Sequence, residues 1–485
     1  MALVIHWFRR DLRLSDNTAL GEALKAGEVV AVFVLDPEIL KRKDTGAARL
    51  DFLYAALSDL DQELRRRGSL LLLRRGEPAE VLSTVAREQG ATACFFNRDY
   101  EPYAIARDAR VTEVLHAQGL SVHSYKDDVM VEAGELPGPR PARVFTPYYR
   151  AWLAAISPAA LTPRSLQGRF VGASAVSSQP IPGPGASAAG LRQAAAGGRA
   201  AAVSDLERFA AGPIQAYAAD RDRLDRPATS RISPYLRFGL VSIRECLRLA
   251  RRTGGAGSEA WERQLAWRDF YRQLLATMPR LEAGPMDERM AGLAWNDDPA
   301  ALLAWREGRT GYPVVDAAMR QLAAEGWLPN RARLIVASFL VKDLGVNWQA
   351  GERVFMERLL DGDLANNNGG WQWVAGTGTD AQPFFRVFNP VLQGRRFDPE
   401  GVYVRRWCPE LEGVPASTIH APWSLNESEQ RRSGCLLGRD YPRPIVDHQQ
   451  ARQLALARFN AVRSRAAASV AGPRSRAGSS PSPGV

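Results

Sequence analysis

Four apolar runs in the first 130 residues constrain the fold most strongly, because each has the length and composition of a buried strand. These runs are LVIHWF (3–8), VVAVFVLD (29–36), LLLLRRG (70–76) and ATACFFN (91–97). Amphipathic stretches separate them, such as RLDFLYAALSDLDQELRRRG, which closes with the kind of glycine that ends helices. Continuous apolar strands are typical of sheets that are covered on both faces. We therefore predict an α/β domain with a doubly wound, Rossmann-like parallel sheet over residues 1–130, with ligands beyond the carboxyl ends of the strands.

The strand–helix alternation stops after residue 130, and the composition then changes twice. Residues 177–190 read SSQPIPGPGASAAG, which is typical of an extended connection, so we predict a long interdomain linker over 131–212. Later segments such as YPVVDAAMRQLAAEGW carry apolar residues three and four apart, which indicates helices. We predict an all-α domain over 213–465 and a disordered tail over 466–485.

The charge balance favours a polyanionic partner. The chain has 63 Lys and Arg against 53 Asp and Glu, a formal net charge of +10. Basic character suits a phosphate backbone, although a basic soluble protein without nucleic acid has the same balance. Charge alone leaves both possibilities open.

Histidine and cysteine positions exclude several kinds of site. No histidine lies between His123 and His420, which rules out a histidine-based acid, base or metal cluster in the middle of the chain. The four cysteines have no CxxC spacing, so a metal site of that type is excluded as well. The chain shows neither a membrane-length apolar run nor a signal peptide. We expect a cytoplasmic protein that binds neither membrane nor metal.

The composition of the octet NNNGGWQW at 366–373 is not expected in an ordinary core segment. Asparagine competes with the helix backbone for hydrogen bonds. Gly369 and Gly370 have no side chain to pack, and they let another group come close to the backbone. Trp371 and Trp373, two positions apart, point to different sides of a helix. This combination of amides, glycines and indoles predicts a site that binds a flat ligand with polar edges.

Three further segments are weaker candidates for binding a ligand. TSRISPYL (229–236) places hydroxyls and Arg231 before a helix that starts with proline, which suits a phosphate cradle or an ordinary helix cap. In WRDFYRQLL (267–275), Arg268 beside an indole suits a base or phosphate contact, or a core tryptophan with a snorkelling arginine. Asp361 and Asp363 lack a third acid or a histidine for a metal, so we expect them to accept hydrogen bonds from a heterocycle or a sugar.

Eight motifs appear in order across nearly the whole chain. They are HWFRRDLRLSDN, TSRISPYL, QLAWRDFY, GYPVVDAAMRQL, ASFLVKDL, DGDLANNNGGWQW, FFRVFNP and YPRPIVDH. Together they resemble the photolyase/cryptochrome family, and most closely the bacterial class I cyclobutane pyrimidine dimer (CPD) DNA photolyases. The resemblance implies an antenna-binding α/β domain and a helical domain that binds FAD and DNA.

One non-covalent FAD, active as FADH⁻, is the cofactor that the resemblance implies. The residues matching the family's FAD site are Tyr217, Thr229, Ser230, Arg231, Ile232, Ser233, Arg268, Arg333, Asp361, Gly362, Asp363 and Asn367. Residues 229–233 with Tyr217 would hold the phosphates, and Asn367 would face flavin N5. Asparagine at 367 favours a photolyase, because plant cryptochromes resemble this pattern but carry aspartate there.

The resemblance also implies roles in electron transfer and in DNA binding. Trp371, Trp348 and Trp295 match an electron-transfer triad, and Trp267 and Trp373 match rings that pack a flipped dimer. Photolyases are themselves known examples of enzymes that extrude their target base. Positions that match DNA-backbone contacts are Arg221, Asn330, Arg331, Arg386 and Gln393. Such contacts give salt-dependent affinity that is largely independent of sequence. The expected partner is UV-damaged DNA containing pyrimidine dimers, bound by a monomer.

The chain departs from the family at the lesion. Gln264 replaces the glutamate of the usual E-L-x-W-R motif, Leu334 stands where methionine is usual, and Pro329 stands where histidine is usual. An amide cannot supply a proton to a developing radical anion, so we expect a lower repair yield. A (6-4) photolyase is disfavoured by the absence of histidines from the middle of the chain. A cryptochrome-type photoreceptor is the alternative of a different class, and the short tail and Asn367 favour repair.

An antenna chromophore is the least constrained part of the resemblance. NRDYEPYAIARD (97–108) resembles deazaflavin-binding photolyases, whereas the folate-binding version has Asn-Glu in place of Tyr103 and Ala104. The candidate antenna residues are Asp36, Arg49, Glu101 and Tyr103. We expect 8-hydroxy-5-deazaflavin rather than folate, with FMN, FAD or an empty pocket as alternatives.

Overall fold

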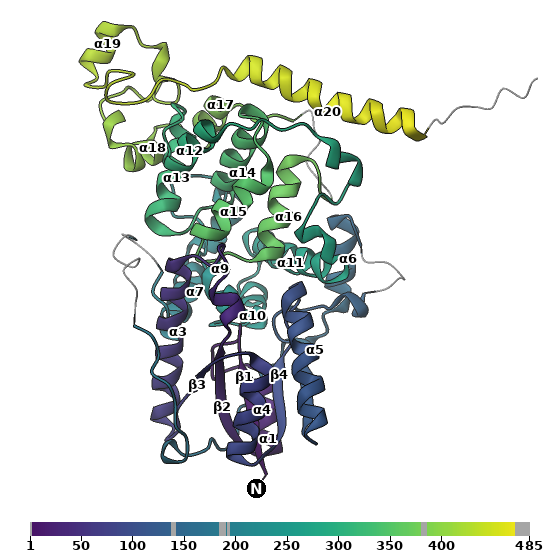
Figure 1. Cartoon of the computed structure of the whole chain (residues 1–485). Coiled ribbons are helices and arrows are strands. Elements are labelled where there is room, and N and C mark those ends of the chain that lie inside the picture. The colour runs from purple at the N-terminus through teal and green to yellow at the C-terminus, as the bar shows by residue number, and fades with distance from the viewer. Residues whose placement is uncertain (1, 137–141, 184–190, 192–194, 380–385, 471–485) are drawn as a thin grey trace, which may run out of the picture.

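The chain folds into an α/β domain with a larger helical domain stacked on one end of its sheet (Figure 1). The structure, a computed structural model, describes residues 2–136, 142–183, 191, 195–379 and 386–470, with residues 466–470 as backbone only. No helix within these ranges is both long enough and apolar enough to cross a bilayer.

A five-stranded parallel sheet forms the α/β domain, in the order β3-β2-β1-β4-β5. Its strands are β1 (Leu3–Phe8), β2 (Glu28–Leu35), β3 (Leu72–Arg75), β4 (Ala91–Asn97) and β5 (Ser121–Tyr125). The four predicted strands are confirmed. The sequence analysis missed β5 because this edge strand, SVHSY, is largely exposed and lacks a continuous apolar run.

Helices cover both faces of the sheet, as a doubly wound fold requires. They are α1 (Thr18–Ala26), α2 (Pro37–Leu40), α3 (Ala47–Arg66), α4 (Pro78–Gln89) and α5 (Pro102–Ala117). Helices α1 and α3 share a core with one face, and α4 and α5 share a core with the other. The strand order reverses between β1 and β4, where such folds often bind ligands. Here Asn97 donates to Asp11 at 2.6 Å and to Asn17 at 2.8 Å, and it lines a small polar pocket together with Arg10 and Asp99.

Most of the described part of the predicted linker packs against one of the two domains. It contains α6 (Phe145–Ala155) and α7 (Arg199–Ala211), which pack against the helical domain. Between them the chain follows the sheet, since the Val171 amide donates to the Val29 carbonyl at 2.9 Å and the Gln179 amide donates to the Leu73 carbonyl at 3.0 Å. The second half of the Pro-Gly-rich stretch, residues 184–190, lies outside the described residues.

The second domain is helical, as predicted, and surrounds its own core. Its helices are α8 (Pro213–Asp220), α9 (Ser233–Phe238), α10 (Ile243–Thr253), α11 (Gly255–Thr277), α12 (Pro299–Glu307), α13 (Pro313–Glu325), α14 (Asn330–Ser338), α15 (Trp348–Arg358), α16 (Leu364–Ala375), α17 (Pro390–Phe397), α18 (Val402–Trp407), α19 (Glu427–Arg432) and α20 (His448–Val470). Helix α14 continues into a π-helical turn, Phe339–Asp343. Helix α20 continues past residue 465, where the sequence predicted a tail, and residues 471–485 lie outside the described part.

Candidate functional site

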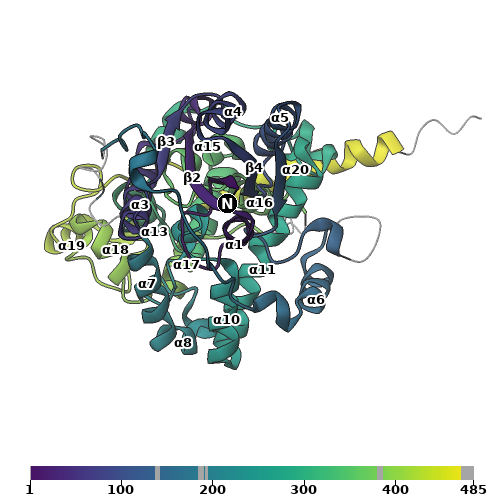
Figure 2. The ribbon, with the colours of Figure 1, turned by 90° about the horizontal axis from the view of Figure 1, so that it is seen from below.

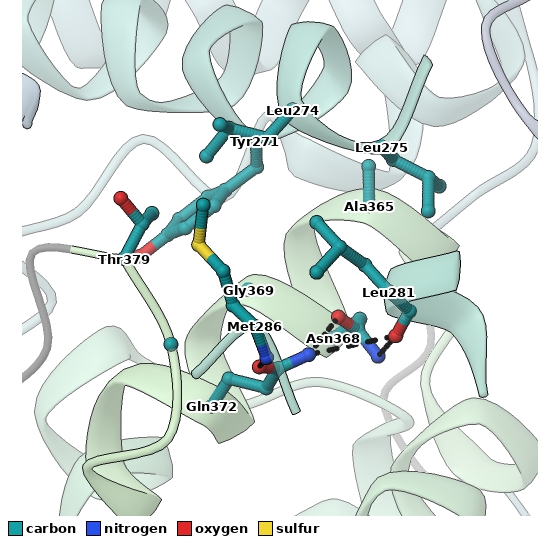
Figure 3. Close-up of a pocket in the computed structure, with 11 residues that line it drawn as sticks. Tyr271, Leu274, Leu275, Leu281, Met286, Ala365, Asn368, Gly369, Gln372 and Thr379 are labelled. Atoms are coloured by element: carbon teal, nitrogen blue, oxygen red, sulfur yellow. Dashed lines mark hydrogen bonds between the residues drawn. The ribbon is translucent and has the colours of Figure 1, made fainter. Parts of the chain in front are cut away.

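The octet lies in helix α16, in spite of its poor helix formers. Asp363 caps the helix by accepting from the Asn366 amide at 3.0 Å, and the Asn366 side chain donates back to Asp363 at 2.7 Å. Asn368 is buried, donates to the Leu281 carbonyl at 3.0 Å and accepts from Gln372 at 2.9 Å (Figure 3). These two asparagines therefore hold α16 in place through their amide groups. The Asn368 oxygen is occupied, whereas the side-chain oxygens of Asn366 and Asn367 have no donor among the described residues.

The Asn367 side chain has one of its two polar groups occupied. Its amide nitrogen donates to the backbone carbonyl of Glu352 at 3.0 Å. Because a carbonyl only accepts, this bond fixes which end of the side chain is the oxygen. No donor to that oxygen occurs among the described residues, and the side chain is half-buried. Asn367 is therefore set to accept a hydrogen bond from a ligand.

Glu352 is a site residue that the sequence analysis missed. It lies on α15, only 7% exposed, and its carboxylate accepts from Asn368 at 2.9 Å. Burial raises the pKa of Glu352 to about 7. The available sequence signal was its position four residues after Trp348, which puts the two side chains on one face of a helix.

The two glycines of the octet have different surroundings. A Cβ at Gly369 would overlap the Tyr271 ring of α11, so this glycine permits close helix packing (Figure 3). A Cβ at Gly370 would meet no heavy atom within 4 Å. Open space beside Gly370, on the helix face that also carries Asn367, suits a planar group that approaches the backbone.

A small apolar pocket opens on the other face of α16. Its lining includes Tyr271, Leu281, Met286, Gly369 and Thr379 (Figure 3). None of the residues predicted to bind the cofactor lines this pocket. The pocket belongs to the packing between α11 and α16, and the predicted site lies on the Asn367 side.

Asp361 and Arg333 form one side of the predicted cofactor site. The Arg333 guanidinium donates to one Asp361 oxygen at 2.7 Å and to the Leu328 carbonyl at 3.0 Å. The other Asp361 oxygen is buried without a partner among the described residues. Buried polar atoms in proteins almost always have partners, so this oxygen suits the N–H group of a bound heterocycle.

Asp363 has a different environment, because both of its oxygens are occupied. One oxygen pairs with Arg10, from the loop after β1, and with Arg272 at 2.7 Å, while the other caps α16. Burial opposes ionisation, but these arginines hold the pKa of Asp363 well below its usual value. Asp363 thus joins the two domains. Because each aspartate already pairs with arginine, the two do not form a cation site.

The predicted phosphate cradle has the backbone shape that binds anions. Arg231 has a left-handed backbone with φ of 51°, and Ile232 follows in the right-handed region. Two successive residues with left-handed and right-handed backbone conformations direct their N–H groups into one concavity. Such a concavity is a known anion-binding site. The Arg231 side chain turns away, donating to Glu325 at 2.9 Å and stacking on Trp327 at 4.4 Å. The backbone, with Thr229, Ser230 and Ser233 half-buried around it, is the part available to a phosphate.

The remaining predicted cofactor residues pack or join the domains. Tyr217 is buried against Phe209, with ring centroids 5.7 Å apart. Arg268 pairs with Asp128, from the segment after β5. The Gly362 carbonyl accepts from Arg49 and from Arg237, each at 2.8 Å.

The three predicted triad tryptophans lead from the core towards the surface. Trp371 and Trp348 are 2% and 3% exposed, whereas Trp295 is half-buried at the edge of the same core. A Cβ at Gly351, one turn after Trp348, would overlap the Trp371 ring. Asn296 pairs with Val346 beside the start of α15, which brings Trp295 close to Trp348. This order suits transfer of an electron from the surface inwards.

The predicted DNA-backbone contacts come from three neighbouring elements, and the predicted lesion residues lie on α11 and α16. Arg331 pairs with Asp222 at 2.7 Å and lies over the Phe397 ring at 4.4 Å, so α14, the loop after α8 and α17 meet there. Arg221, Asn330 and Gln393 belong to these same elements, Arg386 is exposed just before α17, and Trp373 packs at the edge of the helical core.

Two further lesion residues lie on α11. Trp267 stacks on Phe145, with ring centroids 3.7 Å apart. The Gln264 amide makes a single long bond, 3.4 Å, to the Ala260 carbonyl of its own helix. Gln264 is partly exposed and therefore free to contact a substrate.

The predicted antenna residues fall into two groups. The Tyr103 hydroxyl donates to Asp36 at 2.6 Å, which joins α5 to the carboxyl end of β2. Glu101 pairs instead with Arg10 at 2.7 Å, and Arg49 donates to the Met356 and Gly362 carbonyls of the helical domain. Asp36 and Tyr103 thus form one local site, while Glu101 and Arg49 contribute to the domain interface.

Known proteins are similar to this chain over almost its full length. Residues 4–165 match the family described as DNA photolyase, and residues 261–461 match the FAD binding domain of DNA photolyase. The chain is 42% identical to the deoxyribodipyrimidine photo-lyase of Streptomyces griseus, covering 96% of this chain and 99% of that protein.

Solved structures share the fold of the whole chain. A bacterial class III photolyase from Agrobacterium tumefaciens superposes with a TM-score of 0.89 at 36% identity, covering 96% of this chain and 98% of that one. An archaeal photolyase from Sulfolobus tokodaii with two FAD molecules gives 0.80 at 31% identity, covering 95% and 100%. A cryptochrome from Synechocystis gives 0.85 at 29% identity, covering 94% and 99%.

Proposed function

The chain belongs to the DNA photolyase family, and we propose that it is a light-dependent DNA repair enzyme that splits cyclobutane pyrimidine dimers. The observation that carries the proposal is the face of α16 on which Asn367 offers a free oxygen beside the open space at Gly370. This face lies next to Trp371, and its helix also carries Trp373, predicted to contact the lesion. The rival function is a photoreceptor, which would keep FAD and the tryptophans without repairing DNA.

The residues of the site fit FAD. The unpartnered Asp361 oxygen and the Asn367 oxygen offer acceptors to flavin N–H groups, and the concavity at Arg231 and Ile232 offers backbone donors to the phosphates. When bound in the reduced form, FAD supplies, on excitation, the single electron that opens the cyclobutane ring, and it then takes that electron back. The protein binds and orients both partners and keeps the site from water.

Substrate binding falls to aromatic and basic side chains. Trp267 and Trp373 offer rings against which an extruded dimer packs, and a dimer is already poorly stacked in the duplex, which lowers the free energy of extrusion. Arg221, Arg331 and Arg386 supply positive charge for the backbone of UV-damaged DNA. Phosphate contacts of this kind make the affinity fall with rising salt.

The test is repair under blue light. We expect the purified protein, loaded with FAD and reduced, to remove dimers from an irradiated oligonucleotide under blue light and not in the dark, as measured by chromatography of the products. A matched oligonucleotide with a (6-4) photoproduct should stay unchanged. Flavin photochemistry without loss of dimers would instead identify a photoreceptor and contradict the proposal.

We further propose that a second chromophore, 8-hydroxy-5-deazaflavin, binds beside Asp36 and Tyr103. The bond between these residues closes a polar corner at the carboxyl end of the sheet, where folds of this class bind ligands. The two FAD molecules of the Sulfolobus relative make FAD the main alternative. Titration with deazaflavin, folate, FMN and FAD, each followed by energy transfer to the reduced flavin, distinguishes them. A Tyr103→Phe variant should weaken binding of the antenna alone, and an unchanged affinity would place the site elsewhere.

A further inference from the structure

Helix α6 lies beside α11 (Figure 2), and it contributes aromatic side chains that pack on α11. The Phe145 ring stacks on the Trp267 indole at 3.7 Å, with 5° between their planes. Phe145 is fully buried, and Tyr149 stacks on it one turn later at 5.8 Å. One face of Trp267 is therefore covered by protein, and the indole is held in a fixed orientation.

Arg263 lies over this platform. It is on α11, one turn before Trp267 and next to Gln264. Its guanidinium carbon is 4.9 Å from the centroids of both Phe145 and Tyr149. A guanidinium stacked on rings keeps its N–H donors free around its edge.

These donors have no acceptor within the described residues. No carboxylate pairs with Arg263 there, and the side chain is half-buried rather than extended into solvent. Its neighbour Glu262 already pairs with Arg251 at 2.9 Å. Arg263 is thus a cation held in place by aromatic contacts alone, with its hydrogen-bonding capacity unused.

We propose that Arg263 binds a phosphodiester group of the damaged DNA strand beside the extruded dimer, and that Phe145 and Tyr149 hold it ready to do so. This inference rests on the proposed repair function. Residues three and four apart share one helix face, so Arg263 and Trp267 present to the same side. A dimer packed on the free face of Trp267 brings the phosphates of its own strand past the edge of the pocket. The planar guanidinium matches a phosphate with two parallel hydrogen bonds.

The experiment measures the affinity of the FAD-loaded protein for a duplex with one dimer, at several salt concentrations. We expect Arg263→Gln to weaken binding several-fold and to reduce the slope of log K against log[salt] by about 0.9, the value of one phosphate contact. Arg66→Gln, which changes an exposed arginine at the end of α3, should leave affinity and slope unchanged. Arg263→Lys should keep the slope and lose part of the affinity, because an ammonium binds as a point charge.

A second variant separates the positioning role from the charge. Phe145→Leu keeps Arg263 charged but removes the ring beneath it, so we expect the same salt slope with a higher Kd, and Phe145→Tyr should restore the affinity. The absorption spectrum of the bound flavin checks that each variant is folded. A wild-type salt slope and Kd in Arg263→Gln would overturn the inference, provided that the wild type prefers the dimer-containing duplex. If the wild type shows no such preference, the proposed function itself fails, and this inference falls with it.

Discussion

The side chain of Asn367 donates to the backbone carbonyl of Glu352, while the Glu352 carboxylate accepts from the neighbouring Asn368. The same residue of α15 thus orients Asn367, which is predicted to face the cofactor, and anchors Asn368, which fixes the helix. A buried carboxyl at this point links the stability of the site to pH.

Glu352→Gln should remove a pH dependence of stability. Burial raises the folded-state pKa of Glu352 from 4.5 to about 7, so the folded state binds the proton more tightly than the unfolded state. The stabilisation is present below pH 4.5 and is lost as the pH rises through about 7, a total of about 3 kcal/mol at 1.36 kcal/mol per pKa unit. Urea unfolding between pH 5 and 8.5 measures this loss. The glutamine variant should be more stable than the wild type at pH 8.5, and Glu357→Gln, on the exposed side of α15, should keep the wild-type profile. An unchanged profile in Glu352→Gln would contradict the assignment.

Gly369 and Gly370 should respond in opposite ways to alanine. A Cβ at Gly369 overlaps the Tyr271 ring, so Gly369→Ala should destabilise the protein by about 1–3 kcal/mol, as overpacking does. Gly370→Ala meets no neighbour and gains helix propensity, so the protein without FAD should become more stable by up to about 1 kcal/mol. Flavin fluorescence should nevertheless show about tenfold weaker FAD binding in Gly370→Ala, because the methyl group enters the predicted site. Wild-type FAD affinity in that variant would place the cofactor elsewhere.

Substitution of the two aspartates before α16 should have different effects, one on FAD affinity and the other on the stability of the fold. Asp361→Asn removes the charge of a group that pairs with a partly exposed Arg333, so we expect FAD affinity to fall about 10- to 100-fold with little change in unfolding. Asp363→Asn removes the negative charge that the buried Arg272 and Arg10 share, which costs about 3–5 kcal/mol of stability. Thermal unfolding without FAD, together with FAD titration, tests both. Equal losses of stability in the two variants would contradict the distinction.

Trp348→Phe should interrupt electron supply without affecting the substrate site. Trp348 is buried between the positions of Trp371 and Trp295, and phenylalanine retains most of its packing while being far harder to oxidise. We expect light-driven reduction of bound oxidised FAD to slow at least tenfold, as followed by absorption with an external reductant present. Repair by chemically reduced enzyme should stay at the wild-type level. Normal photoreduction in the variant would remove Trp348 from the pathway.

Much of the architecture was predictable because it depends on local periodicity. Continuous apolar runs predicted β1 to β4, and three- and four-residue spacing predicted α13, since burial of one face imposes these patterns. The edge strand β5 carries no such pattern because water covers much of it. The octet was singled out as a candidate ligand site, but its spacing could not show that both ends of the Asn368 side chain bind protein groups.

Pairings between distant segments were not predictable. Arg10 and Asp363 are 353 positions apart, and nothing near either residue indicates the other. For the same reason Asp363, Arg268 and Arg49 were assigned only to ligands, whereas each also forms part of the contact between the domains. Glu352 was overlooked because a single acid on an amphipathic helix usually faces solvent. Only the packing of α15 against α16 shows that it is buried.

Gln264→Glu should raise the repair yield. The Gln264 amide makes only a 3.4 Å bond to the Ala260 carbonyl, so the substitution breaks no strong contact and the fold should be unaffected. A carboxyl group that is protonated next to the dimer can donate a proton to the developing radical anion, whereas an amide can only share a hydrogen bond. We expect more dimers split per absorbed photon at saturating substrate, with dimer affinity unchanged within a few-fold. Gln264→Met, which keeps the length but loses both polar atoms, should fall below the wild type. A glutamate variant with the same or a lower yield would show that residue 264 does not limit repair in this protein.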